Sequence, residues 1–222
     1  MEIKILRRVL AANEAVAKSN KELFSQHGVL VLNLMSSPGS GKTCIIEQSV
    51  EALKNDYRIA VIIGDITSTI DAQRLSGLGV PIIQINTEPF GGECHLEASW
   101  VREAALSLNL QDLDLIFIEN VGNLVCPAEF DTGADKNVVI VSLPEGEDKP
   151  LKYPLMFRIS SVLLVNKIDL ASVLDADKKT LHRNALQVNP NLQIFDISAK
   201  TGEGFDAWLK WIEAELRKKR QQ

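Results

Sequence analysis

The chain has 222 residues, the size of one α/β domain or at most two small ones. Its 45% hydrophobic and 24% charged residues exclude wholesale disorder, and it contains no apolar run long enough for a membrane-spanning helix. The net charge of −5 does not favour a general nucleic-acid binder. The N-terminal residues lack the apolar core of a secretory signal, and the three cysteines do not suggest a disulfide framework. We therefore expect a cytoplasmic protein with free thiols.

A helical pattern over residues 2–25 opens the chain and is expected to end at His27-Gly28. We expect residues 1–27 to pack as a helix on a domain formed by residues 28–222. Seven short β-rich runs follow, and most are continuously apolar: Val29–Met35, Arg58–Asp65, Val80–Asn86, Asp114–Glu119, Asn137–Leu143, Val162–Asn166 and Gln193–Ile197. Such runs are typical of strands that are buried on both faces of a mainly parallel sheet.

Helical patterns separate these runs at about residues 42–55, 70–78, 95–109, 174–188 and 205–219. The segment 148–158 contains two prolines and predicts a loop with a short helix. Alternating strands and helices indicate one doubly wound α/β domain. The predicted fold is a mostly parallel seven-stranded sheet with helices on both faces.

The segment SSPGSGKT, residues 36–43, lies between the first predicted strand and a predicted helix. It matches the phosphate-binding pattern GxxxxGK[ST] except that Ser36 replaces the first glycine, so the fold is predicted to be that of a P-loop NTPase. Lys42 is expected to reach the β- and γ-phosphates as a catalytic residue, and Thr43 to bind Mg²⁺. The remaining predicted phosphate-site residues are Gly39, Ser40, Gly41 and Cys44, although packing is the simpler role for the Cys44 thiol.

A base-recognition motif, NKID, closes the sixth predicted strand, and the tripeptide SAK follows the seventh. The carboxylate of Asp169 can accept hydrogen bonds from both N1–H and N2–H₂ of guanine, whereas adenine lacks that donor pair. The Lys167 stem can lie along the purine, and Asn166 can hold the loop or contact N7. The sequence therefore predicts a GTP or GDP site that includes Asn166, Lys167, Asp169, Ser198, Ala199 and Lys200.

Acidic residues follow two predicted strands at the edge of the sheet where the P-loop lies. Asp65 ends the second strand, and Glu119 ends the fourth. We expect both to be catalytic, one through Mg²⁺ and the other by orienting water, with Thr43 and Asp71 as further Mg²⁺ ligands. A helix-start acid is an equally good interpretation of Asp71. Gly122 could offer its N–H group to the γ-phosphate.

Cys94-His95 and Cys126 form a second group of candidate metal ligands. Two thiolates and an imidazole suit Zn²⁺ or Ni²⁺ rather than Mg²⁺. Cys126 lies four residues beyond Gly122, on the segment predicted to sense the γ-phosphate. Three ligands leave a tetrahedral site incomplete, and a two-fold dimer could complete it. The alternative is a pair of buried cysteines beside a histidine that starts a helix.

Taken together, these segments resemble the HypB family, GTPases that assist nickel insertion into [NiFe]-hydrogenase. The resemblance rests on SSPGSGKT, GDITSTIDAQR, GECHLEA, IENVGNLVCPAEFDTG and VNKIDL. It implies Mg²⁺-dependent GTP hydrolysis and a homodimer favoured by GTP. It also implies that Cys94, His95 and Cys126 form an interface site for nickel or zinc. The partners that it implies are the nickel-delivering zinc protein HypA and the hydrogenase large-subunit precursor. Charge and hydropathy predict no nucleic acid and no membrane as partners.

Two features of some family members, an N-terminal CxxCGC motif and a His-rich tract, do not occur in this sequence. We therefore expect metal handling to depend on the GTPase-domain site or on a partner. Three other functions stay open on the sequence alone. They are a GTPase for another metallocentre such as that of urease, a non-catalytic zinc-stapled GTP-binding dimer, and a small-molecule kinase.

Overall fold

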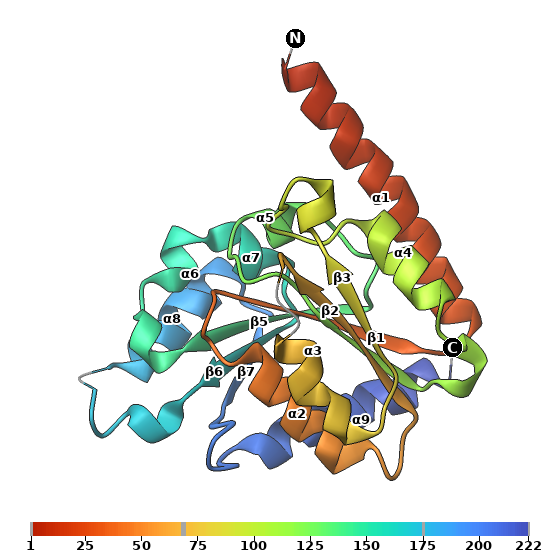
Figure 1. Cartoon of the computed structure of the whole chain (residues 1–222). Helices are drawn as coiled ribbons and strands as arrows, with labels where there is room; N and C mark the ends of the chain where they lie inside the picture. Colours follow the sequence, from red (N-terminus) through yellow and green to blue (C-terminus); the bar gives the residue numbers. More distant parts are fainter. Residues whose placement is uncertain (1, 68–69, 175, 222) are drawn as a thin grey trace.

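The computed structural model describes residues 2–67, 70–174 and 176–221. Within these residues one sheet of seven strands is parallel throughout, in the order β3-β2-β4-β1-β5-β6-β7 (Figure 1). The strands are β1 (Leu30–Ser36), β2 (Ile59–Asp65), β3 (Ile82–Asn86), β4 (Leu115–Glu119), β5 (Lys136–Ser142), β6 (Val162–Asn166) and β7 (Gln193–Asp196). The predicted seven-stranded parallel sheet is confirmed, and its strand bounds shift by at most two residues.

Helices cover both faces of the sheet because strand side chains alternate between the faces. Leu30, Leu32 and Leu34 of β1 pack with α2 (Lys42–Leu53), α3 (Ile70–Leu75) and α9 (Phe205–Lys219). On the other face, Val31 packs with α1 (Glu2–Gln26) and α4 (Ala98–Leu106). Met35 packs on that face with α7 (Pro154–Ile159) and α8 (Lys178–Val188).

Several predicted helix bounds are wrong, and side-chain hydrogen bonds explain two of them. The helix predicted at 95–109 spans only Ala98–Leu106, because the N–H of Leu96 donates to the Asn120 side chain. The helix predicted from residue 174 begins at Lys178, where Asp177 caps the first turn. The first crossover helix ends at Leu53 rather than 55.

Short helical turns complete the chain, and they refine two further predictions. The helix predicted at 70–78 is α3 followed by the 3₁₀ turn η1 (Ser76–Leu78). Segment 148–158 holds two short helices, α6 (Lys149–Lys152) and α7, because Pro154 starts a new one. The other short elements are η2 (Glu88–Phe90), η3 (Leu110–Asp112), α5 (Cys126–Glu129), η4 (Leu143–Glu145) and η5 (Ile168–Leu170).

The C-terminal part of α1 is fastened to the rest of the protein by buried contacts. Ala17 and Phe24 are buried, and the Asn20 amide donates to the carbonyls of Ala98 and Thr132. Gly28 ends the helix in the left-handed conformation, as the sequence predicts. A domain division after residue 27 stays a prediction. None of the helices in the described part of the chain is long and apolar enough to cross a membrane.

Candidate functional site

The P-loop connects β1 to α2 and lines a cavity of about 600 Å³ at the carboxyl edge of the sheet. Gly39 and Gly41 adopt positive φ angles of 76° and 99°, which glycine tolerates best. A side chain at position 41 would also collide with the amide of Asn166. The glycine pattern is therefore required both by the turn and by the neighbouring loop.

Lys42 is almost fully buried at 8% exposure, and its Nζ donates to Ser36 Oγ over 2.9 Å. Burial lowers the pKa of Lys42, while Glu119 and Asp71 oppose that shift. Ser36, which departs from the usual glycine, thus provides an acceptor for the lysine. A phosphate oxygen would compete with this hydroxyl for the ammonium group.

The predicted Mg²⁺ ligands line the same cavity. Thr43 Oγ1 donates to Glu119 Oε1 over 2.8 Å, and Asp65 and Asp71 lie on the cavity wall. Glu119 is 4% exposed, and its Oε2 has no hydrogen-bond partner within the described residues. Burial raises the pKa of Glu119 to about 7, although Lys42 and Thr43 act against it. A divalent cation would satisfy Oε2 and favour the ionised carboxylate, so the residues fit Mg²⁺.

A second cavity of about 410 Å³ adjoins the first and is lined by Asn166, Lys167, Asp169, Ala199 and Lys200, among others. The Asn166 side chain donates to the Ser40 carbonyl over 2.8 Å and accepts from the Ala199 N–H over 3.1 Å. Lys167, at a φ of 61°, donates from Nζ to the Gly39 carbonyl over 2.7 Å. The structure therefore brings the P-loop and the two predicted base-recognition loops into direct contact.

The base-recognition carboxylate is itself tied to the SAK loop. Ser198 Oγ donates to Asp169 Oδ1 over 2.7 Å. The N–H of Thr201 donates in turn to Ser198 Oγ over 3.1 Å. Such an orienting contact restricts the carboxylate to one direction, which a bidentate contact with guanine requires.

Gly122, the predicted γ-phosphate sensor, lies directly against the P-loop. A Cβ atom at this position would come within 3.0–3.2 Å of Pro38. Gly122 and the preceding Asn120 and Val121 also line the cavity beside the P-loop, which we call the phosphate cavity. The segment that follows β4 is therefore placed where it would meet the end of a bound phosphate chain.

The candidate metal ligands converge in one chain. The donor atoms of Cys94, His95 and Cys126 all lie within 4.8 Å of one another. His95 is 4% exposed and stacks on Phe130 at a centroid distance of 3.7 Å. Among the described residues, neither ring nitrogen of His95 has a hydrogen-bond partner. A buried imidazole in this state is suited to binding a metal.

Burial affects the histidine and the cysteine of this cluster in opposite ways with respect to metal binding. Burial lowers the pKa of His95, which keeps its ring neutral. Burial, followed by the contact with Cys94, raises the pKa of Cys126 to about 11, so this thiol must lose a proton when a metal binds. The two sulfur atoms are 2.7 Å apart, whereas tetrahedral zinc ligands are roughly 3.8 Å apart. The residues therefore fit a thiolate-binding metal if the sulfurs separate by about 1 Å.

Asn120 connects the two segments that carry these ligands. Its Oδ1 accepts from the N–H groups of Leu96 and Val121, and its Nδ2 donates to Asn33 Oδ1 in the core. The segment after β4 and the segment before α4 are thus held together by one buried amide.

Comparison with known proteins shows the family of the chain. The nucleotide-binding domain described as CobW/HypB/UreG matches residues 30–196. The probable hydrogenase maturation factor HypB of Methanocaldococcus jannaschii is 41% identical over 215 residues, covering 97% of this chain and 96% of the relative. The chain belongs to the HypB family. The Escherichia coli K12 hydrogenase maturation factor HypB is 47% identical over 207 residues, 93% of this chain and 70% of its own length.

Solved HypB structures share the fold. HypB from Archaeoglobus fulgidus superposes with a TM-score of 0.86 at 36% identity, covering 93% of this chain and 99% of that one. HypB from Helicobacter pylori, solved in complex with nickel, gives 0.87 at 37% identity and covers 93% and 96%. The resemblance to the HypB family is therefore confirmed, and so is the P-loop NTPase fold.

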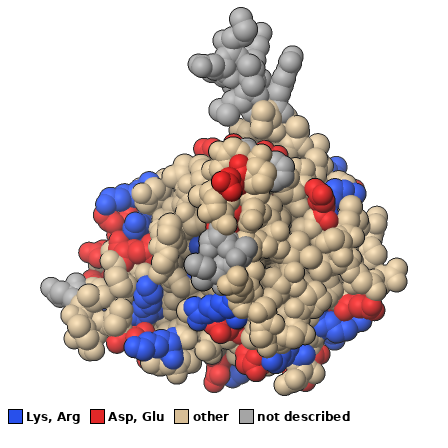
Figure 2. Space-filling model, viewed as in Figure 1, with Lys and Arg blue, Asp and Glu red and all other residues tan. Residues whose placement is uncertain are grey.

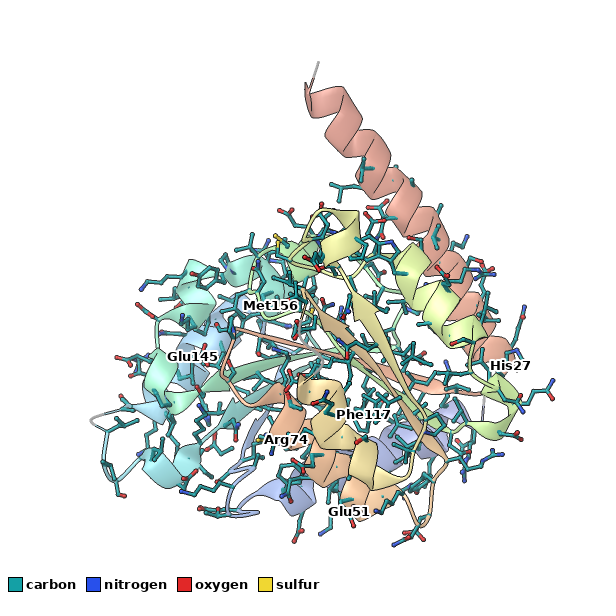
Figure 3. The ribbon with its side chains drawn as sticks, in the orientation of Figure 1. His27, Glu51, Arg74, Phe117, Glu145 and Met156 are labelled. Atoms are coloured by element: carbon teal, nitrogen blue, oxygen red, sulfur yellow. The ribbon has the colours of Figure 1, made fainter. Side chains whose placement is uncertain are left out.

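Two residues near the sites of this HypB family member were missed by the sequence reasoning. Glu145 Oε1 accepts from Ser40 Oγ over 2.7 Å and from both N–H and Oγ of Ser142. Arg74 lines both the phosphate cavity and the second cavity, beside Asn166 and Asp169, which we call the base cavity. Figure 3 labels both side chains. Arg74 belongs to the motif GDITSTIDAQR, but the pattern alone does not show where its side chain lies.

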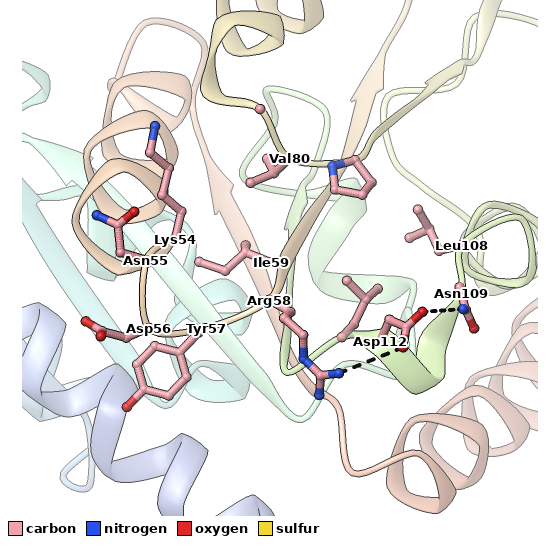
Figure 4. A pocket seen from close by; sticks show the side chains of 13 residues that line it. Lys54, Asn55, Asp56, Tyr57, Arg58, Ile59, Val80, Leu108, Asn109 and Asp112 are labelled. Atoms are coloured by element: carbon pink, nitrogen blue, oxygen red, sulfur yellow. Dashed lines mark hydrogen bonds and ion pairs between the residues drawn. The ribbon is translucent and has the colours of Figure 1, made fainter.

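A further cavity of about 440 Å³ lies at the opposite edge of the sheet, where β2, β3 and β4 begin (Figure 4). Arg58 spans it toward Asp112 at 3.9 Å, and none of the predicted site residues lines it. Positive and negative side chains are interspersed around the face shown in Figure 2. The predicted site residues of this HypB family member therefore lie at the carboxyl edge and not around this cavity.

Proposed function

We propose that this HypB family member is a GTP-hydrolysing metallochaperone that assists nickel insertion into a [NiFe]-hydrogenase precursor. It holds nickel or zinc at Cys94, His95 and Cys126. The observation that carries the proposal is the short connection between the two sites. Glu119 accepts a hydrogen bond from Thr43 of the P-loop. Cys126, only seven residues further along the chain, contacts Cys94. The names of the relatives, hydrogenase maturation factors, support the same role.

Each predicted site residue has a separate role in the proposed hydrolysis of GTP. Asp169 selects guanine, Lys42 holds the β- and γ-phosphates, and the P-loop N–H groups surround them. Mg²⁺, when bound by Thr43 and Glu119 with Asp65 or Asp71, would neutralise phosphate charge. Asp65 or Glu119 orients the attacking water, and the Gly122 segment responds to the loss of the γ-phosphate.

The metal site supports the proposed homodimer. Three donors from one chain leave a position for water, for a partner protein or for a donor from a second copy. A GTP-favoured dimer would place two such clusters at one interface, where nickel could move between HypA and the hydrogenase large-subunit precursor. A cytoplasmic location, expected from the free thiols, is part of the same proposal.

One relative favours a second candidate function, the maturation of urease. HypB of Helicobacter hepaticus, called a hydrogenase/urease maturation factor, is 42% identical over 215 residues, covering 95% of this chain. Nickel is the shared cargo in that proposal. Deletion of the gene would distinguish the two functions. Hydrogenase activity should fall if the protein matures hydrogenase, urease activity should fall if it matures urease, and added nickel should restore the activity that is lost.

The direct test measures phosphate release from GTP and from ATP with Mg²⁺, together with the nickel or zinc content of the protein. We expect hydrolysis of GTP alone and about one metal ion per Cys94–His95–Cys126 cluster. Binding of GTP without phosphate release would instead support the zinc-stapled, non-catalytic dimer. Preference for ATP would exclude the assignment of Asp169.

A further inference from the structure

Arg74 lies at the junction of the two cavities. The phosphate cavity and the base cavity share three of their lining residues, Gly41, Cys44 and Arg74. A guanine nucleotide with its phosphates in one cavity and its base in the other must pass its α-phosphate and ribose across this junction. Arg74 is therefore next to the one part of the nucleotide to which no residue is yet assigned.

The charges of the phosphate cavity leave a role for this arginine. Its described lining carries three carboxylates, from Asp65, Asp71 and Glu119, but two cations, Lys42 and Arg74. Mg²⁺ would engage the carboxylates, and Lys42 is directed to the far end of the phosphate chain. Arg74 is the remaining described cation on the cavity wall. A guanidinium group matches phosphate oxygens better than an ammonium group does.

The present partners of Arg74 hold it close to the junction without burying it. Its Nε and one terminal nitrogen both donate to Oε2 of Glu47 on α2, the first over 2.9 Å. The Arg74 side chain is 46% exposed, so it can reorient toward a bound nucleotide without disturbing the buried core. Glu47 and Arg74 thus join the P-loop helix α2 to α3.

We propose that Arg74 is a nucleotide-binding residue that contacts the α-phosphate and ribose, and that Glu47 competes with the nucleotide for its guanidinium group. This inference rests on the proposed function, because that function places a guanine nucleotide in the two cavities. A contact at the α-phosphate is common to GMP, GDP and GTP. A contact at the γ-phosphate would instead affect GTP alone.

The experiment compares Arg74→Ala with Glu47→Ala, since both substitutions break the same ion pair. Displacement of a fluorescent GDP gives the affinities for GMP, GDP and a non-hydrolysable GTP analogue. We expect Arg74→Ala to weaken all three by a similar factor, about tenfold for the loss of one charge-assisted hydrogen bond. Glu47→Ala should keep or tighten them, because it releases the guanidinium to the nucleotide. Arg74→Lys should recover part of the affinity, since it keeps charge but not the planar fork.

Several outcomes would overturn the inference. Equal losses in Arg74→Ala and Glu47→Ala would show that the ion pair is only structural. Loss confined to the GTP analogue would move the contact to the γ-phosphate, and unchanged affinities would remove the contact altogether. Urea unfolding of each variant controls for folding. If wild-type protein bound no guanine nucleotide, the proposed function would fail instead, so the two failures are distinguishable.

Discussion

Substitution of Asn166 by alanine tests the shared architecture of the nucleotide site. The side chain is 2% exposed and satisfies two backbone groups, the Ser40 carbonyl at 2.8 Å and the Ala199 N–H at 3.1 Å. Each buried group left unpaired costs about 1–3 kcal/mol. Because both loops border cavities, water can reach part of the gap, so we expect a loss near the lower end, about 2–3 kcal/mol in the free energy of unfolding. GDP affinity should fall as well, because the P-loop and the base loops lose their common anchor.

Urea unfolding, with and without saturating GDP, measures the first effect, and a GDP titration measures the second. Asn189→Ala is a matched control. Its amide donates to the carbonyls of Phe157 and Ser160, at the opposite edge of the sheet. This control should lose comparable stability while binding GDP normally. If Asn166→Ala bound GDP as tightly as wild type while both variants were equally destabilised, the reasoning that this amide positions the nucleotide loops would be refuted.

Three further substitutions test the assigned roles. Asp169→Asn should shift preference from GTP toward XTP, because xanthine carries a carbonyl where guanine has its amino group; equal GTP affinity in both proteins would reject the base assignment. Lys42→Ala should abolish phosphate release and cripple GTP binding with a near-native melting curve, and near-normal turnover would contradict it. Nickel affinity should differ roughly 5–150-fold between the GDP and GTP-analogue states, and Cys126→Ala should remove that difference; identical affinities would leave a passive metal site.

The sheet could be predicted because its strands are marked by local sequence. Continuous apolar runs distinguish strands that are buried on both faces, whatever their neighbours are. Helix bounds were less predictable where a distant side chain takes a backbone N–H group. Asn120 bonds to Leu96, and Asn13 accepts from the N–H of Ala98, so α4 starts later than its apolar pattern suggests. Contacts between residues so far apart in the chain leave no periodic signal in either segment.

The candidate sites show the same distinction. The P-loop and NKID segments each contain most of their own geometry, so residue type and spacing were enough to suggest their chemistry. The contact of Glu145 with Ser40 joins residues more than one hundred positions apart, and no local pattern marks it. The metal ligands stand between these cases. Their residue types indicated a soft metal, but only the fold places Cys94 beside Cys126 within one chain.

That placement changes how the two sites could communicate. The sequence places Cys126, but neither Cys94 nor His95, on the segment that carries the predicted γ-phosphate sensor. In the structure, however, Asn120 bonds both to its own segment, through Val121, and to the other ligand segment, through Leu96. Movement of the Gly122 segment would therefore displace both ligand segments together, so Cys94, His95 and Cys126 should shift partly as a unit. Nucleotide would then act more on the fourth metal position than on the spacing of the three resident donors. Any such effect is reciprocal, since metal must alter nucleotide affinity by the same factor.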